Sequence, residues 1–199
     1  MTDEQVSDRI LTIPNLVSFT RLAAIPVFWW LLLGVEEIAA ATILFAVIAT
    51  TDWIDGYLAR RLGQVSKLGK NLDPIADRLM IASAIVAGLI ADIIPPAVGW
   101  TLIVREVYMA AVTAVLFLRR AGMLDVRWLG KVATFMVYTS IGWFYFAAIP
   151  FLEEILIPAA WIVGVAGLAL YWVTALQYTG DARRALAAVG SPSVPEESG

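Results

Sequence analysis

The sequence lacks two residue types that carry much of enzyme chemistry. Its 199 residues include no cysteine and no histidine. The first absence excludes disulfide bonds, thiol chemistry and thiolate metal sites. The second removes the commonest general base, the usual zinc ligand and any phosphohistidine intermediate. Any chemistry must therefore depend on carboxylates, Lys and Arg side chains, hydroxyl groups and a hard metal ion.

Charged residues are also scarce, at 16% of the chain, whereas 60% of the residues are hydrophobic and eight are Trp. A soluble domain would be nearer half apolar and a quarter charged. The net charge of −3 gives no indication of a nucleic-acid binder. Six apolar segments are each long enough to cross a bilayer, and backbone groups in lipid must be satisfied within the segment. The predicted fold is therefore an all-α polytopic membrane protein with six transmembrane helices. The segments run over Asn15–Gly34, Ile38–Ala59, Pro74–Ile93, Ala97–Leu118, Val132–Ile149 and Leu156–Tyr178.

The basic residues predict the orientation of these spans. None of the 14 lies in the links Val35–Glu37, Ala91–Pro96 or Pro150–Ile155. By the positive-inside rule, both termini should lie in the cytoplasm. We expect residues 1–14 to form an interfacial helix rather than a signal peptide, because they lack a basic n-region. Residues 15–186 would form one transmembrane domain, and the Pro/Ser/Glu-rich tail 187–199 would be disordered.

Four aspartates stand out at the junction of the second and third spans, in the segment "DWIDGYLARRLGQVSKLGKNLDPIAD". Asp52 and Asp55 are three residues apart, and Asp73 and Asp77 are four apart, so each pair should share a helix face. We expect the two pairs to face each other across a groove at the cytoplasmic side. Gly69 is a predicted turn or cap. Unneutralised, four carboxylates would repel one another near lipid, whereas divalent cations such as Mg²⁺ prefer oxygen ligands. A solvated surface loop is the plainer alternative.

The spacing D-x2-D-G-x2-A-R-x8-G-x3-D-x3-D resembles the signature of the CDP-alcohol phosphatidyltransferases. Its positions are filled by Asp52, Asp55, Gly56, Ala59, Arg60, Gly69, Asp73 and Asp77. The segment "TIPNLVSFTRL" and the six spans are also similar to this family, and the resemblance covers most of the chain. It implies transfer of a phosphatidyl group from CDP-diacylglycerol to an alcohol, with release of CMP. It further implies a homodimer in the bacterial cell (inner) membrane, with the active site facing the cytoplasm.

Carried over by position, the resemblance also assigns roles to individual residues. Asp52, Asp55, Asp73 and Asp77 would hold two divalent cations, Mg²⁺ or Mn²⁺, and Asp77 would also be the general base. The contacts to CDP-diacylglycerol would come from Asn15, Ser18, Gly56, Arg60, Ser66 and Gly69. A direct in-line attack is favoured, although the sequence leaves an aspartyl intermediate open.

The acceptor site is predicted from the remaining basic residues. Lys131, in "LGKVATF", should open the fifth helix and bind acceptor phosphate. Arg105 in mid-span either pairs with an acidic residue or binds the acceptor. For Arg119 and Arg120 the alternatives are membrane anchoring or acceptor binding, and the role of Arg127 stays open.

Several alternatives for the whole protein remain at this point. The segments "VRE" and "GKVATF" resemble the glycerol branch of the family, which favours glycerol 3-phosphate as acceptor. A cardiolipin synthase using phosphatidylglycerol is the next alternative, ahead of a phosphatidylinositol-phosphate synthase. From other classes, an ion-coupled transporter or an inactive membrane scaffold would explain the acids differently. The small residues of "IVGVAGLAL" would support dimer contacts or packing within one subunit.

Overall fold

The computed structural model describes residues 13–62, 67–121 and 128–190. Of these, residues 13–15, 51–62, 67–74 and 188–190 are described by their backbone only. These ranges contain helices and no strand, which confirms the all-α prediction. The elements are α1 (Ile13–Trp29), η1 (Trp30–Gly34), α2 (Ile38–Leu62), α3 (Lys67–Ile90), α4 (Pro96–Leu118), α5 (Trp128–Ala147) and α6 (Glu153–Gly190).

Each predicted span corresponds to one helix or, for the first, to α1 continued by the π-helical turn η1. Three described segments are long and apolar enough to cross a membrane, namely Leu16–Gly34, Pro96–Leu118 and Glu153–Ala187, and the protein is a membrane protein. The part of α2 whose side chains are described, Ile38–Thr50, is also apolar. The predicted interfacial helix and most of the predicted tail lie outside the described residues, although α6 continues to Gly190.

The start of the third helix was predicted incorrectly. The sequence suggested a turn at Gly69 and a helix that begins near Pro74, but α3 begins at Lys67 and runs through both residues. A proline inside a helix removes one backbone hydrogen bond and crowds the carbonyl four positions earlier, but here α3 continues through Pro74. The described part of α2 ends at Leu62, and α3 begins at Lys67.

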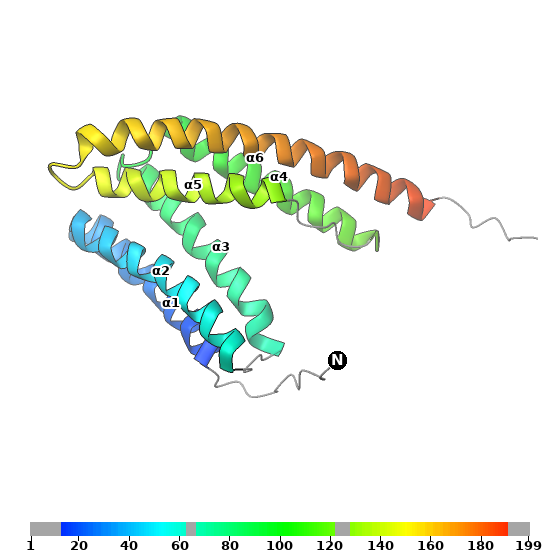
Figure 1. Cartoon of the computed structure of the whole chain (residues 1–199), viewed down its shortest axis with the longest axis horizontal. Coiled ribbons are helices and arrows are strands. Elements are labelled where there is room, and N and C mark those ends of the chain that lie inside the picture. Colours follow the sequence, from blue (N-terminus) through cyan, green and yellow to red (C-terminus); the bar gives the residue numbers. More distant parts are fainter. Residues whose placement is uncertain (1–12, 63–66, 122–127, 191–199) are drawn as a thin grey trace, which may run out of the picture. The chain divides into compact units, whose positions relative to one another are not determined.

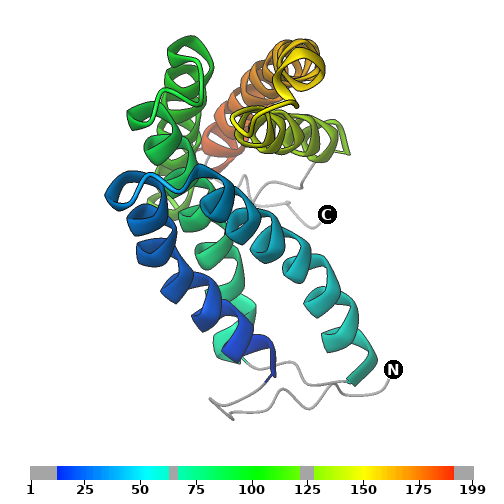
Figure 2. The same ribbon diagram turned by 90° about the vertical axis from the view of Figure 1, so that its left-hand side faces the viewer.

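The chain divides into two compact units, and we describe each by itself. Unit 1 comprises residues 1–96 and 141–160, and unit 2 comprises residues 97–140 and 161–199. In unit 1, α1 packs against both α2 and α3, and successive helices run in opposite directions (Figures 1 and 2). Three buried rings, Phe28, Phe45 and Tyr145, form its aromatic core, with ring centroids 5.5–6.1 Å apart. The Tyr145 hydroxyl donates a 2.6 Å hydrogen bond to the Ala84 carbonyl of α3.

Unit 2 is built on close packing of α5 against α6. A Cβ placed on Gly164 of α6 would lie 2.5 Å from Ser140 Oγ of α5. A Cβ on Gly167, one turn later, would lie 3.1 Å from the backbone nitrogen of Val137. These glycines therefore allow the two helices to approach closely. Of the two interpretations of "IVGVAGLAL", packing within one subunit is confirmed for Gly164 and Gly167.

Helix α4 ends in a Schellman motif, in which two backbone N–H groups bond to carbonyls of the last turn. Ala121 donates to Leu116 and Arg120 donates to Phe117. Arg120 occupies the left-handed position of the motif, with φ of 53°. Glycine is the usual residue there, because a side chain makes this conformation less favourable by about 1 kcal/mol.

Candidate active site

The aspartate segment lies at one end of unit 1. The first turns of α1, the last turns of α2 and the first turns of α3 all lie at this end of the unit, which we call the aspartate end (Figures 1 and 2). Asp52 and Asp55 are both in α2, and Asp73 and Asp77 are both in α3. Each pair therefore has the helical spacing that the sequence predicts. Whether the pairs face each other stays a prediction.

Only Asp77 of the four aspartates has a described side chain. It is half-buried on α3 and interacts with neighbouring groups. The side chains whose placement is described form no group of three metal-ligating residues. The side chains of Asp52, Asp55 and Asp73 are not among those described, so metal binding by the four aspartates stays a prediction.

The predicted CDP-diacylglycerol contacts belong to the same end of unit 1. Ser18 lies on α1 and is completely buried, and Asn15 is one turn earlier on that helix. The backbone of Gly56 and Arg60 belongs to the C-terminal part of α2, and that of Gly69 to the first turn of α3. Ser66 lies outside the described residues. The helices thus bring the described members of this set to the aspartate end.

The sequence prediction overlooked Arg21, which is 2% exposed and lies one turn after Ser18 on α1. Both residues have interaction partners in the structure. An arginine stays protonated, and burying its charge is unfavourable unless the group is paired. Arg21 therefore brings a fixed positive charge to the end of unit 1 that carries the four acids. The available signal was an ionisable residue inside an apolar segment, which usually marks a functional position.

The buried stripe of α1 changes character along the helix. It is polar near the aspartate end and apolar beyond, and consists of Ser18, Arg21, Ala24 and Phe28 of α1, continued by Leu32 of η1. These residues follow the three-to-four-residue period of one helix face. The stripe places polar side chains at the end of unit 1 where the active site is predicted. Its apolar residues pack in the interior of the unit further along the helix.

The two acceptor candidates belong to unit 2. Arg105, in α4, is only 9% exposed. Its Nη1 donates a 2.8 Å hydrogen bond to Oε1 of Glu106, and its guanidinium carbon lies 3.5 Å from the centre of the Tyr171 ring. Pairing with an acidic residue is therefore what the structure shows, and acceptor binding by Arg105 stays a prediction. Lys131 is exposed in the first turns of α5, which confirms that it lies at the start of the fifth helix.

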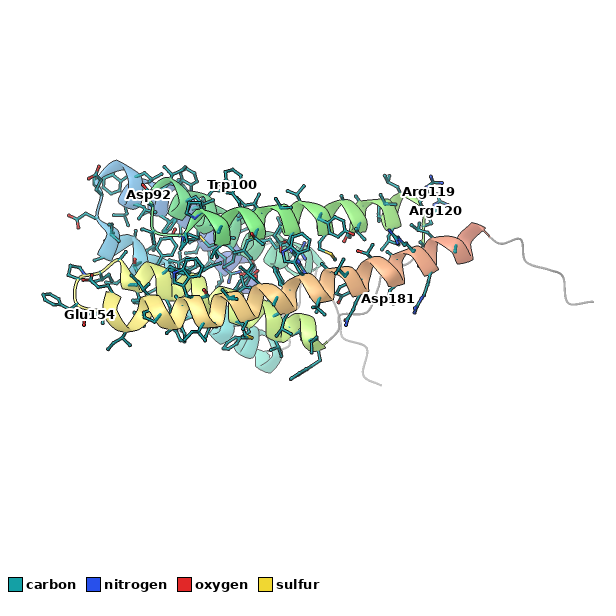
Figure 3. All side chains as sticks on the ribbon, turned by 90° about the horizontal axis from the view of Figure 1, so that it is seen from above. Asp92, Trp100, Arg119, Arg120, Glu154 and Asp181 are labelled. Atoms are coloured by element: carbon teal, nitrogen blue, oxygen red, sulfur yellow. The ribbon has the colours of Figure 1, made fainter. Side chains whose placement is uncertain are left out.

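The arginines that follow α4 are placed by its cap. Arg119 and Arg120 are exposed at its C-terminal end, beside the half of α6 that carries Asp181 (Figures 1 and 3). The last residues of α4, Phe117 and Leu118, are about four-fifths exposed, as expected for lipid-facing side chains. The sharp change from apolar to cationic is typical of a membrane interface. Arg127 lies outside the described residues.

Comparison with known proteins identifies the class of this enzyme. The family model described as CDP-alcohol phosphatidyltransferase matches residues 11–172, which include the four aspartates, Arg105 and Lys131. The chain belongs to the CDP-alcohol phosphatidyltransferase family. It is accordingly a transferase of phospholipid biosynthesis, which decides against the transporter and scaffold alternatives.

Curated relatives represent two activities within the glycerol branch. A cardiolipin synthase (CMP-forming) of Streptomyces coelicolor is 35% identical over 89% of this chain and 86% of its own length. A CDP-diacylglycerol–glycerol-3-phosphate 3-phosphatidyltransferase of Escherichia coli K12 is 34% identical over 86% of this chain and 94% of its own length. The Bacillus subtilis protein of the latter name is 32% identical over 71% and 80%. These names confirm the glycerol branch.

Proposed function

We propose that the protein transfers the phosphatidyl group of CDP-diacylglycerol to a hydroxyl of glycerol 3-phosphate and releases CMP. The observation that carries this proposal is the family match, because it spans both the aspartate segment and the two acceptor candidates. The near-complete overlap with the Escherichia coli relative supports this acceptor. The exposed cation of Lys131 suits the acceptor's phosphate, because charge-assisted hydrogen bonds to phosphate are strong.

The donor set at the aspartate end fits two divalent cations. Carboxylate oxygens are the ligands that Mg²⁺ and Mn²⁺ prefer, and α2 and α3 each bring two aspartates to this end of unit 1. Asp52, Asp55, Asp73 and Asp77 would hold the ions. When bound, such ions neutralise phosphate charge and favour departure of CMP.

Asp77 is proposed as the base of the reaction. It takes the proton from the acceptor hydroxyl while that oxygen forms a bond to the phosphorus of the phosphatidyl group. The bond from phosphorus to the CMP oxygen breaks in the same displacement. No histidine or cysteine is available for a covalent phosphoenzyme, which favours this direct transfer. Asn15, Ser18, Gly56, Arg60, Ser66 and Gly69 are proposed to bind the nucleotide and diphosphate.

Phosphatidylglycerol is the second candidate acceptor, because the Streptomyces coelicolor relative is named a CMP-forming cardiolipin synthase. Both acceptors present a glycerol hydroxyl and an anionic phosphate, so the same cations suit either. With either acceptor, we propose the same arrangement of the protein. It has six spans in the bacterial inner membrane, its termini and active site face the cytoplasm, and it forms a homodimer. The positive-inside distribution of basic residues supports that orientation.

An assay with the purified full chain in detergent micelles tests the acceptor. CDP-diacylglycerol is supplied with glycerol 3-phosphate or with phosphatidylglycerol, and lipid products are separated by mass. We expect phosphatidylglycerophosphate and one CMP for each product molecule. Cardiolipin formed only with phosphatidylglycerol would replace the first acceptor by the second. Absence of CMP with both acceptors would refute the proposed reaction.

A further inference from the structure

A chain of polar side chains joins all three helices of unit 2. Tyr171 of α6 donates a 2.6 Å hydrogen bond to Oε1 of Glu106, the same atom that binds Arg105 Nη1. Thr134 of α5 is a further side-chain neighbour of the Tyr171 hydroxyl, and its own hydroxyl donates a 2.9 Å hydrogen bond to the Gly130 carbonyl. Lys131 precedes Thr134 by three residues on α5, so the two are neighbours on that helix surface. We call these five residues the polar track.

The polar track leads from an exposed end to a buried one. Lys131 is exposed, Thr134 is half-buried and Arg105 is buried. Arg105 is 13 residues before the last residue of α4, which places it about 20 Å along the helix from that end. Ionisable groups at such depth are unfavourable in lipid and usually mark a substrate path or site.

The guanidinium group of Arg105 is held in place by two contacts, but one of its hydrogen-bond donors has no acceptor among the residues that the structure describes. Glu106 fixes Nη1, and the Tyr171 ring covers one face of the group. Its Nε atom is buried, and within the described part of the chain no hydrogen-bond acceptor meets it. A purely structural ion pair would be expected to satisfy every buried donor. A cation that is held in place with a donor to spare suits an anionic ligand.

We propose that Glu106 and Tyr171 are positioning residues for the acceptor. They hold Arg105 at the buried end of the polar track, and the track takes the phosphate-bearing glycerol head group from Lys131 inward. The chemistry is the same for a free glycerol phosphate and for the head group of an anionic glycerophospholipid. This inference rests on the proposed function and adds the residues that orient its acceptor.

Two conservative variants and one matched control test the proposal. Tyr171→Phe removes the hydroxyl but keeps the ring beside Arg105, and Glu106→Gln removes the charge while keeping an oxygen acceptor. The control is Tyr108→Phe, which breaks another hydrogen bond between α4 and α6, the 2.6 Å contact of Tyr108 with Thr179. Initial rates of CMP release are measured with each substrate varied in turn, using glycerol 3-phosphate and phosphatidylglycerol in separate arms.

We expect Tyr171→Phe and Glu106→Gln to raise the KM of the acceptor about tenfold, equivalent to about 1.4 kcal/mol. The KM of CDP-diacylglycerol should stay within about twofold of the wild-type value, and Tyr108→Phe should leave both KM values within that range. The acceptor whose KM rises, glycerol 3-phosphate or phosphatidylglycerol, is the one whose head group Arg105 binds.

Equal effects of Tyr171→Phe and Tyr108→Phe on the acceptor KM would overturn the proposal, because the network would then only join two helices. Equal changes in the KM of both substrates would overturn it as well. If Glu106→Gln fails to fold, Tyr171→Phe decides the matter, since it keeps the packing of the ring. A failure of the proposed function is distinct, because the wild-type protein would then release no CMP in either arm.

Discussion

The contact between α5 and α6 allows a quantitative prediction about packing. Replacing Gly164 by Ala puts a methyl group 2.5 Å from Ser140 Oγ, and the same change at Gly167 puts one 3.1 Å from the backbone nitrogen of Val137. Gly180, on the same helix, has no heavy atom within 4 Å of the position of a Cβ. Gly180→Ala is therefore a matched control that adds the same methyl group in open space.

The expected loss of stability is the difference in free energy of unfolding between Gly167→Ala and its control Gly180→Ala. Overpacking by a methyl group typically lowers the free energy of unfolding by about 1–3 kcal/mol, whereas replacing a helical glycine by alanine raises it by about 1 kcal/mol. The second effect is common to all three variants and cancels. Gly167→Ala should thus be about 1–3 kcal/mol less stable than Gly180→Ala, which for a chain of this size is roughly 2–12 °C in melting temperature.

The clash at Gly164 should be reversible by a second substitution. Removing the hydroxyl in the double variant Gly164→Ala/Ser140→Ala leaves the Ser140 Cβ 3.3 Å from the new methyl group, a tight but tolerable contact. We expect the double variant to regain most of the stability, with Ser140→Ala alone completing the cycle. No side-chain substitution can remove the clash at Gly167, because that contact is with the backbone nitrogen of Val137.

Intrinsic Trp fluorescence during heating in detergent would report the melting temperatures. Gly167→Ala melting together with Gly180→Ala would refute the close helix contact. A double variant no more stable than Gly164→Ala would show that Ser140 does not limit the approach of the two helices.

Four further predictions concern activity and the core. Chelation by EDTA should abolish CMP release, and added Mg²⁺ or Mn²⁺ should restore it. Asp55→Asn should lower kcat about 100-fold or more, as expected for the loss of one group that stabilises transition-state charge. Full activity of either preparation would contradict the metal proposal. Lys131→Ala should raise the acceptor KM about tenfold, from the loss of a charge-assisted hydrogen bond, while equal loss for CDP-diacylglycerol would make Lys131 structural. Tyr145→Phe should lower stability by about 1–2 kcal/mol, because the buried Ala84 carbonyl loses its side-chain donor, and unchanged melting would contradict that role.

The sequence predicted the helices well because their signal is local. Apolar segments of about 20 residues, bounded by charges or turn residues, leave few alternatives to a helix in lipid. The start of α3 was wrong because Gly69 and Pro74 are common at helix ends, and their local preference outweighed the continuing helix in our prediction. The cap at Arg120 gave no recognisable signal, since glycine rather than arginine usually marks that conformation.

The candidate site was only partly predictable for a related reason. The aspartates lie on adjoining helices with a four-residue gap between the described ends, so their spacing alone brings them to one end of unit 1. The contact of Tyr171 with Glu106 joins residues 65 positions apart in the chain, and no periodicity indicates such a pairing. Arg21 was missed because its apolar neighbours suggested an ordinary span, although its burial shows a different environment.

The graded stripe of α1 limits how this helix can move during turnover. A piston-like slide by one turn, about 5.4 Å, would carry Arg21 into the level of Ala24 and towards the rings around Phe28. Arg21 is already buried and has interaction partners, so moving its guanidinium away from them towards aromatic side chains would leave a buried charge unpaired, which is strongly unfavourable. The polar and apolar halves of the stripe therefore oppose a slide of α1 along its own axis. A movement that admits the proposed lipid substrate would then involve the neighbouring helices or a tilt of α1, rather than a slide of α1 along its axis.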